Sequence, residues 1–274
     1  MKIGIITASY NRPDLLRRCI DSVRSQSYSN WVMYVVDDCS TVNIDELSDM
    51  YRDPRLSLQK LPQNVGANHV RNVALARALH DGCDAIFLLD DDDFLTEHAL
   101  QNMVDQTQAY PNESWFVFNV EGYQRVLEPY TFIQQPFSFD YISDYLLGKK
   151  VRSDKSHLIR ADAVRHIRFS TQVRNGDEWT FFLQIARRHR CMALPNIVKV
   201  VDYQNDGLSV ALSGRQYTFQ KIWLDMKKPV LCWYYRPLLR RAATRSLQSV
   251  FRFPVRLLLL AWQQCQYLFA SRQR

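Results

Sequence analysis

Short apolar runs separated by amphipathic segments dominate the first 120 residues of the chain. The runs are rich in β-branched and aromatic residues, and each has the length of a buried strand. We therefore predict strands at Ile3–Ala8, Trp31–Val36, Leu56–Leu61, Ala85–Leu89 and Trp115–Val120.

Helical spacing marks the segments between these runs. Pro13 suits the first turn of a helix, and apolar residues then recur at the helical period: Leu15, Leu16, Cys19, Ile20 and Val23. Further helices are predicted at Ile44–Tyr51, at Ala67–Leu79, and from a capping Thr96 to about Tyr110. Strands that alternate with helices indicate an α/β fold class, with a mostly parallel sheet covered by helices on both faces.

The pattern is less regular beyond residue 120. Residues 121–152 are irregular and rich in aromatic side chains, and residues 153–168 predict a strand or turn with a short helix. A late strand is predicted at Ile197–Val201. A helix is predicted at Trp179–Arg187, with one face shared by Trp179, Phe182, Leu183 and Ala186.

An acidic cluster, Asp90–Asp93, follows one of the predicted strands in the stretch FLLDDDDFL. Open α/β sheets bind ligands at the carboxyl ends of their strands, and carboxylate oxygens there suit Mg²⁺ or Mn²⁺, which can hold a diphosphate. The alternative is a solvated acidic turn. The apolar residues on both sides of the cluster favour a ligand site.

Polar residues also follow the first two predicted strands, at Ser9–Arg12 and at Asp37-Asp38. Loops at the same edge of a sheet can converge on one ligand. The chain contains neither GxGxxG nor GxxxxGK[ST], so neither a dinucleotide fingerprint nor a P-loop is supported.

Composition narrows the class of protein. Hydrophobic residues make up 47% and charged residues 23%, as in soluble globular proteins. The six cysteines are scattered without a CxxC pair, which argues against a zinc site and a disulfide framework and favours a reducing compartment. The N-terminus lacks signal-peptide features, and no apolar run is long enough to span a membrane. We therefore expect a cytoplasmic protein.

Charge separates the last segment from the rest. Residues 215–274 carry twelve Lys or Arg and one acidic residue, a local charge of +11, which leaves −4 for residues 1–214. Aromatic and leucine side chains lie among these cations, and Val255–Trp262 is apolar but too short to span a membrane. This favours a basic amphipathic helical extension at a membrane surface. The alternative is a helical pair that packs on the body or forms a homodimer contact.

Four segments together resemble family 2 glycosyltransferases of the GT-A fold, such as bacterial enzymes that build surface polysaccharides. They are ITASYNRPDLLRRCIDSVRSQSYSNWVMYVVDDCST, NVGANHVRNVALARA, FLLDDDDFL and NGDEWTFFLQIA, in that order along the chain. The resemblance covers about residues 1–210. It implies a GT-A (Rossmann-like) domain with a nucleotide-sugar-binding half at 1–110 and an acceptor-binding half at 111–214, followed by the basic extension at 215–274.

The activity implied by the resemblance is a metal-dependent, inverting transfer of a sugar. The donor is a nucleotide-diphosphate sugar, with UDP expected for the nucleotide, and the metal is Mn²⁺ or Mg²⁺. The acceptor is a hydroxyl of a glycan or lipid-linked glycan in surface polysaccharide or lipopolysaccharide synthesis. Such an acceptor and the basic extension place the protein at the inner face of the cytoplasmic membrane. No nucleic-acid partner is expected.

The resemblance assigns the acids of the cluster to metal and donor. Asp92 is the expected metal ligand, Asp90 faces the ribose or the metal through water, and Asp93 lies near the sugar or the metal. Asp91 belongs to the donor-binding set. Because the four acids are contiguous, this register can slip by one residue.

The other donor contacts come from the strand ends and the middle helix. By resemblance, Asp38 recognises the base or ribose with Asp37 beside it, although an Asx turn also explains the pair. Contacts from Thr7, Ser9 and Arg12 to the nucleotide are expected, and Arg71 is expected on nucleotide or phosphate. Each arginine also has a plainer interpretation as a surface cation.

Asp177 and Glu178 compete for the general base. Alignment on the following Trp179 favours Glu178, whereas the family more often has Glu before Asp, which keeps Asp177 as the alternative. Many relatives also carry a His after the last strand, and this chain has none there. Asn205 or Asp206 would have to replace it if the metal takes a ligand from that region.

Two other classes of protein remain open. A nucleotidyltransferase on a related α/β scaffold would release pyrophosphate instead of a nucleoside diphosphate. A non-enzymatic binder of nucleic acid or glycan would use the basic aromatic extension, but it would give the acidic cluster no role.

Overall fold

A computed structural model describes residues 1–42, 46, 51–124, 131–146, 150–171 and 178–204. Four features predicted above lie outside the described residues: nearly all of the helix at Ile44–Tyr51, the carboxylate of Asp177, the pair Asn205-Asp206, and the extension 215–274. None of the described helices is long and apolar enough to cross a membrane.

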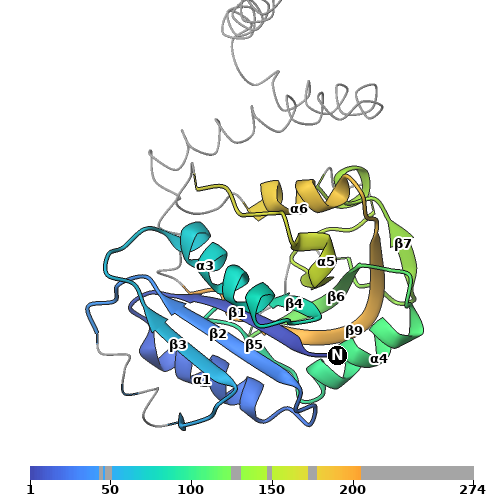
Figure 1. Cartoon of the computed structure of the whole chain (residues 1–274). Coiled ribbons are helices and arrows are strands. Elements are labelled where there is room, and N and C mark those ends of the chain that lie inside the picture. The colour runs from blue at the N-terminus through green and yellow to red at the C-terminus, as the bar shows by residue number, and fades with distance from the viewer. Residues whose placement is uncertain (43–45, 47–50, 125–130, 147–149, 172–177, 205–274) are drawn as a thin grey trace, which may run out of the picture. The chain divides into compact units, whose positions relative to one another are not determined.

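The described residues form a single mixed sheet with helices packed against it (Figure 1). The strand order is β3-β2-β1-β4-β8-β6-β9-β5, and β7 pairs with β9 as well. The strands are β1 (Ile3–Ser9), β2 (Trp31–Asp37), β3 (Leu56–Lys60), β4 (Ala85–Leu88), β5 (Phe94–Leu95), β6 (Trp115–Gly122), β7 (Phe137–Phe139), β8 (Ser156–Arg160) and β9 (Cys191–Val201).

The N-terminal half of the sheet is parallel, as the alternation of strands and helices predicts. Ile3 of β1 pairs with Trp31 of β2 on one side and with Ala85 of β4 on the other. The apolar residues of these strands are buried on both faces, which is the pattern of a parallel sheet between helices. All five strands predicted in the first 120 residues of the chain are confirmed, within a few residues at their ends.

The second half of the sheet is mixed, because β8 runs opposite to both of its neighbours, and β5 and β7 run opposite to β9. β8 pairs antiparallel with β4 and with β6, so β6 runs in the same direction as β4. β9 is parallel to β6. Six strands, β1, β2, β3, β4, β6 and β9, therefore end at the same edge of the sheet. We call this edge the carboxyl edge.

Helices cover both faces of the sheet (Figure 1). They are α1 (Pro13–Arg24), α3 (Ala67–His80), α4 (Ala99–Ala109), α5 (Ala161–Val164), α6 (Glu178–Ala186) and a π-helix, η1 (Tyr141–Leu146). The apolar face of α1 joins one core cluster with α4 and the strands. On the opposite face, α3 packs so closely on β1 that a Cβ at Gly4 would lie 3.0 Å from that of Ala78.

Two local predictions are wrong in detail. Thr96 does not cap α4: the helix begins at Ala99, and the Thr96 hydroxyl donates to the Ile197 carbonyl, because the preceding Phe94-Leu95 is a strand paired with β9. In α6, Trp179 and Ala186 are only partly buried, whereas Phe181 and Ile185 are fully buried. The predicted single face fails because Phe181 stacks on Phe169 while Phe182 stacks on Trp115.

Candidate active site

Polar residues gather at the carboxyl edge, at or after the ends of five of its six strands. Each of these strands continues into a loop or turn that bears polar side chains: Ser9 to Arg12, Asp37 and Asp38, Asp90 to Asp93, Tyr123, and Asp202. This is the edge at which open α/β sheets bind ligands. The segments predicted to converge therefore do so.

The acidic cluster forms a tight turn directly after β4. The Asp93 amide donates to the Asp90 carbonyl at 3.2 Å, which turns the chain back toward β5. Asp91 and Asp93 are buried, whereas the side chains of Asp90 and Asp92 keep 49% and 20% of their surface exposed. Asp90 and Asp92 are therefore the two acids that a ligand can reach most readily.

Cations from three elements pair with these acids. Arg12 lies 2.9 Å from Asp92 and 3.5 Å from Asp91, so it is not a plain surface cation. Lys199 of β9 contacts Asp93 at 2.5 Å, and both side chains are buried. The Asp202 amide donates to the other oxygen of Asp93 at 3.2 Å, so protein groups occupy both oxygens of Asp93.

Arg71 of α3 joins the acidic turn to α6. One guanidinium nitrogen lies 2.8 Å from Asp90, and another lies 2.6 Å from Glu178. The Arg71 side chain is only 14% exposed, which excludes the interpretation as a helix-surface arginine. Glu178 is the first residue of α6, and its carboxylate is thereby held toward Asp90.

Crowding of the carboxylates shifts their pKa values. Burial, together with repulsion from Asp92, raises the pKa of Asp91 to about 7. Burial and the Asp90 charge also raise the pKa of Asp92. Burial alone would raise the pKa of Asp90, but the positive charges of Arg71 and Lys199 outweigh burial and hold the pKa of Asp90 below its usual range. Negative charge at this turn is therefore only partly offset by protein cations.

The donor set expected on the first two strands is held by the protein itself. Asp37 accepts hydrogen bonds from the Ser40 amide at 2.8 Å and from the Ser40 hydroxyl, so its side chain closes the turn that follows β2. The Asp38 carboxylate accepts from the Val65 and Gly66 amides at 2.6 and 2.8 Å. Asp38 therefore fixes the loop that enters α3.

Thr7 and Ser9 lie at the end of β1 and are buried. Their side chains therefore offer little surface to a nucleotide in this conformation. The loop that follows β1 carries Asn11 and Arg12. That loop is fastened to the one after β2, because the Asn11 amide donates to the Ser40 hydroxyl at 2.7 Å.

Three charged residues of the site were not predicted from the sequence: Arg18, Lys199 and Asp202. Arg18 of α1 pairs with Asp202 at 2.7 Å and donates to the Asp92 carbonyl at 2.6 Å. Lys199 had one visible signal, a lone cation in the apolar run of a predicted strand. Arg18 had none, because a charged residue on an amphipathic helix is ordinarily solvated.

The acidic turn can supply part of a coordination sphere for a divalent cation. Asp90 and Asp92 each have one oxygen outside the ion pairs with Arg71 and Arg12. Within the part of the chain that the structure describes, no group of three or more His, Cys, Asp or Glu is gathered closely enough to hold a metal alone. Mg²⁺ commonly takes one or two carboxylates and completes its sphere with water and substrate phosphates. The two carboxylates fit that mode.

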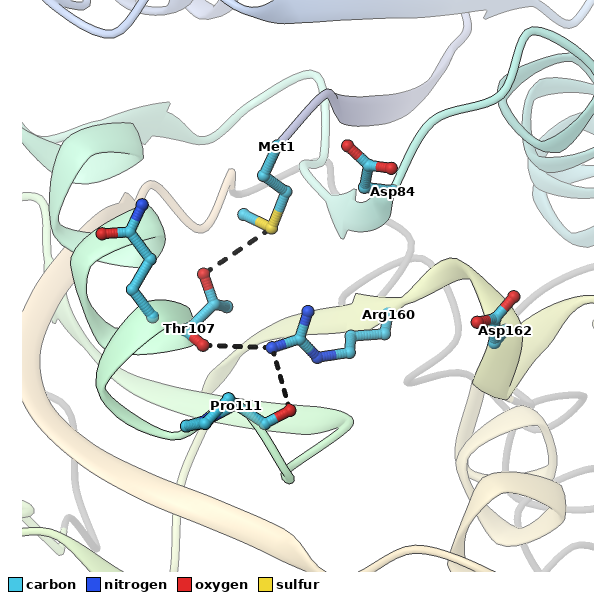
Figure 2. A pocket seen from close by; sticks show the side chains of 7 residues that line it. Met1, Asp84, Thr107, Pro111, Arg160 and Asp162 are labelled. Atoms are coloured by element: carbon cyan, nitrogen blue, oxygen red, sulfur yellow. Dashed lines mark hydrogen bonds between the residues drawn. The ribbon is translucent and has the colours of Figure 1, made fainter.

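A hollow of about 410 Å³ lies away from the acidic turn (Figure 2). Met1, Asp84, Thr107, Pro111 and Arg160 are among its lining residues. These residues come from strand and helix ends opposite the carboxyl edge: Met1 precedes β1, Asp84 precedes β4, and Arg160 ends β8. The Arg160 guanidinium donates to the Thr107 carbonyl at 3.0 Å and to the Glu113 carbonyl at 2.8 Å. These hydrogen bonds fix the end of α4 and the loop after it against β8.

Residues 4–168 match Glycosyl transferase family 2, which is more than half of the chain. The chain belongs to this family, which confirms the resemblance seen in the sequence. It is 33% identical over 145 residues to TuaG of Bacillus subtilis (strain 168), a glycosyltransferase named for teichuronic acid biosynthesis, with 51% of this chain and 55% of TuaG covered. It is also 33% identical over 145 residues to WcaA of Escherichia coli (strain K12), which is named for colanic acid biosynthesis, with 50% of each chain covered. The chain thus spans about half the length of these relatives.

Solved structures confirm the fold class. TarS 1–349 of S. aureus, in complex with UDP-GlcNAc, superposes with a TM-score of 0.69 at 18% identity, covering 84% of this chain and 66% of TarS. The mannosyltransferase PcManGT of Pyrobaculum calidifontis, in complex with GDP-Man and Mn²⁺, gives a TM-score of 0.58 at 18% identity, covering 97% of this chain and 80% of that one. At such identities the likeness shows the fold alone.

Proposed function

We propose that the chain is a metal-dependent, inverting glycosyltransferase that moves a sugar from a nucleotide-diphosphate donor to a hydroxyl of a glycan or lipid-linked glycan. One observation carries the proposal: Arg71 joins the acidic turn at Asp90 to the carboxylate of Glu178. A site for a leaving diphosphate and a group able to accept a proton thus lie one side chain apart. Transfer of a group from phosphate to a hydroxyl needs both.

The nucleotide of the donor lies over the ends of β1 and β2 in this proposal. Asp37 and Asp38 fix the loops around it, Arg12 lines the start of the site, and the buried Thr7 and Ser9 support it from the end of β1. The diphosphate continues to Arg71 and the acidic turn. Arginine suits phosphate because its planar fork can donate two parallel hydrogen bonds.

Asp92 and Asp90 would hold Mn²⁺ or Mg²⁺ together with the diphosphate, with Asp91 beside them. The bound cation would offset negative charge on the departing diphosphate. Asp93 has both oxygens engaged by Lys199 and by the Asp202 amide, so we propose that it shapes the turn from behind and does not bind the metal directly. The occurrence of Mn²⁺ with GDP-Man in PcManGT supports divalent-cation use in this fold.

Glu178 acts as the general base, with Asp177 as the alternative outside the described residues. The acceptor oxygen attacks the anomeric carbon from the face opposite the diphosphate, the carboxylate takes the hydroxyl proton, and the bond from sugar to phosphate oxygen breaks. In the present conformation Arg71 occupies one oxygen of Glu178. Donor phosphates would compete for Arg71 and so release the carboxylate for the acceptor.

The acceptor class and the location rest on relatives and on the basic extension. TuaG and WcaA are named for the biosynthesis of teichuronic acid and colanic acid, which supports a role in surface polysaccharide or lipopolysaccharide synthesis. Residues 215–274, with their charge of +11, would place the chain at the anionic inner face of the cytoplasmic membrane. The halves 1–110 and 111–214 would then present donor and acceptor to one another, and a homodimer contact through the extension is also open.

A thermal-shift screen tests the donor site. UDP- and GDP-sugars are added with and without Mn²⁺, because a ligand at 100 times its Kd stabilises the folded state by about 2.7 kcal/mol. For a chain of this size the expected rise in Tm is about 5–10 °C. Asp92→Asn should lose the metal-dependent part of the rise, whereas Asp105→Asn, on the exposed side of α4, should keep it. No rise with any nucleotide sugar, or a full rise in Asp92→Asn, would overturn the proposal.

A further inference from the structure

Tyr123 presents an exposed aromatic ring at the carboxyl edge. It directly follows β6, and 40% of its surface is exposed. Its amide donates to the Val201 carbonyl at 2.9 Å, which fixes its backbone against the end of β9. Its ring meets that of Phe94 edge to face, with 5.5 Å between centroids. The ring is therefore held in place although it faces solvent.

Arg18 ties this ring to the acidic turn. The guanidinium carbon lies 5.3 Å from the Tyr123 centroid and 4.6 Å from the Phe94 centroid. The same guanidinium donates to the Asp92 carbonyl at 2.6 Å and pairs with Asp202 at 2.7 Å. One side chain thus spans from the proposed metal ligand to the aromatic ring. Cation–π contacts of this kind contribute about 0.5–1 kcal/mol at exposed sites.

Sugar rings suit the surface that these residues form. A pyranose has a face of C–H bonds, which packs on an aromatic ring, and a rim of hydroxyl groups, which needs hydrogen-bond partners. Tyr123 supplies the ring, and Asp202 and Arg18 supply a charged acceptor and donor beside it. Ligand sites commonly combine one apolar wall with a few placed polar groups.

The sheet order assigns the ring to the acceptor side. β6 is two strands from β4, and strands lie about 4.8 Å apart, so the end of β6 is about 10 Å across the sheet from the acidic turn. The proposed nucleotide site lies in the other direction, over β1 and β2. We propose that Tyr123, held by Arg18 and Phe94, forms a subsite on which a sugar ring of the acceptor stacks. This inference rests on the proposed function, because it takes the acidic turn as the donor site.

Saturation-transfer NMR with the full chain tests the subsite. The probes are the methyl glycosides of glucose, galactose, mannose and N-acetylglucosamine, in the presence of UDP and Mg²⁺. Wild type and Tyr123→Phe should show saturation of the C–H face of at least one glycoside. Tyr123→Ala and Tyr123→Leu should weaken the binding by about tenfold, because both lose the aromatic face. Leucine keeps apolar bulk against Phe94, which guards against a loss caused by misfolding.

Further variants separate this subsite from the donor site. Arg18→Met frees the ring and should lower the signal, whereas Arg17→Met, at an exposed neighbouring position, should not. Wild type without UDP and Mg²⁺ should keep the glycoside signal, because the subsite includes neither the nucleotide nor the metal. Three results would each overturn the subsite: no signal from any glycoside in wild type, an unchanged signal in Tyr123→Ala, or an unchanged signal in Arg18→Met. Failure of the donor site itself would show instead as absent nucleotide binding in the thermal-shift screen.

Discussion

Replacement of Lys199 by methionine tests how the acidic turn is held. Lys199 lies 2.5 Å from Asp93, with side-chain exposures of 10% and 4%. Methionine has a similar length but no charge, so Lys199→Met leaves the Asp93 carboxylate buried without its cation. Breaking a buried ion pair from one side costs about 3–5 kcal/mol, because the remaining charge is uncompensated.

The loss is large enough to measure by equilibrium unfolding. For a chain of this size, 3–5 kcal/mol lowers Tm by about 6–20 °C. Urea unfolding followed by circular dichroism should show the same loss at an unchanged m-value. Lys60→Met is the matched control: Lys60 is an exposed lysine at the end of β3, and its replacement should change stability by no more than about 0.5 kcal/mol.

The double variant Asp93→Asn with Lys199→Met removes both charges. It should be more stable than Lys199→Met alone by about 1–3 kcal/mol, since contacting residues couple by amounts of this size. If Lys199→Met unfolds at the same urea concentration as Lys60→Met, the ion pair does not hold the turn. Equal stability of Lys199→Met and the double variant would show that the two charges are not coupled, which contradicts the geometry.

Three further predictions concern Arg71, His157 and Asp38. Arg71→Met should lower kcat for donor hydrolysis by about 100-fold or more. Arg71→Lys should not restore kcat, since one ammonium cannot reproduce the planar bridge between Asp90 and Glu178. A wild-type kcat in Arg71→Lys would refute the bridge. Burial lowers the pKa of His157 to about 3, with Lys199 and Lys155 adding to the effect. The unfolded chain therefore gains this proton below pH 6.5 and the folded chain does not, so stability present at pH 7 is lost as pH falls, by about 2–3 kcal/mol at pH 4.5. His157→Phe should lack this part of the pH dependence in urea unfolding, and an identical slope in both proteins would count against it. Asp38→Asn keeps only one good acceptor for the Val65 and Gly66 amides and should lose about 1–3 kcal/mol in the same unfolding assay; unchanged stability would mean that the clamp is dispensable.

Local patterns predicted the N-terminal half of the fold well. The strand, helix and strand from Ile3 to Asp37 follow from the spacing of apolar residues and from Pro13. Both signals lie within a few neighbouring residues of the sequence. The acidic turn was likewise predictable, because a run of carboxylates after a buried strand has few stable placements. Its position at the carboxyl edge then follows from the parallel sheet.

Features set by distant pairing were not predictable. The reversal of β8 depends on which strands it joins, and nothing within Ser156–Arg160 states that direction. Thr96 looked like a cap because it precedes an apolar helix, yet pairing of Phe94-Leu95 with β9 moves the helix start to Ala99. Arg18 became part of the site only through partners far away in the sequence.

The candidate site was therefore only partly predictable. Asp90, Asp92, Arg71 and Glu178 were singled out from motif and resemblance, and the fold brings them together. The cations that neutralise the cluster were harder to find, because a lysine in a strand or an arginine on a helix has many ordinary roles. Only the tertiary contacts distinguish these roles.

Product analysis tests the central claim most directly. The full chain is incubated with Mn²⁺ and UDP-N-acetylglucosamine or GDP-mannose, and the nucleotides are separated by chromatography. The account predicts slow release of UDP or GDP, because water accepts the sugar when no other acceptor is supplied. The rate of release should fall at least 100-fold in Asp92→Asn, since the carboxylates would hold the cation that offsets charge on the leaving group. Release of UMP or GMP with a sugar 1-phosphate, which is cleavage between the two phosphates, or wild-type rates in Asp92→Asn, would contradict it.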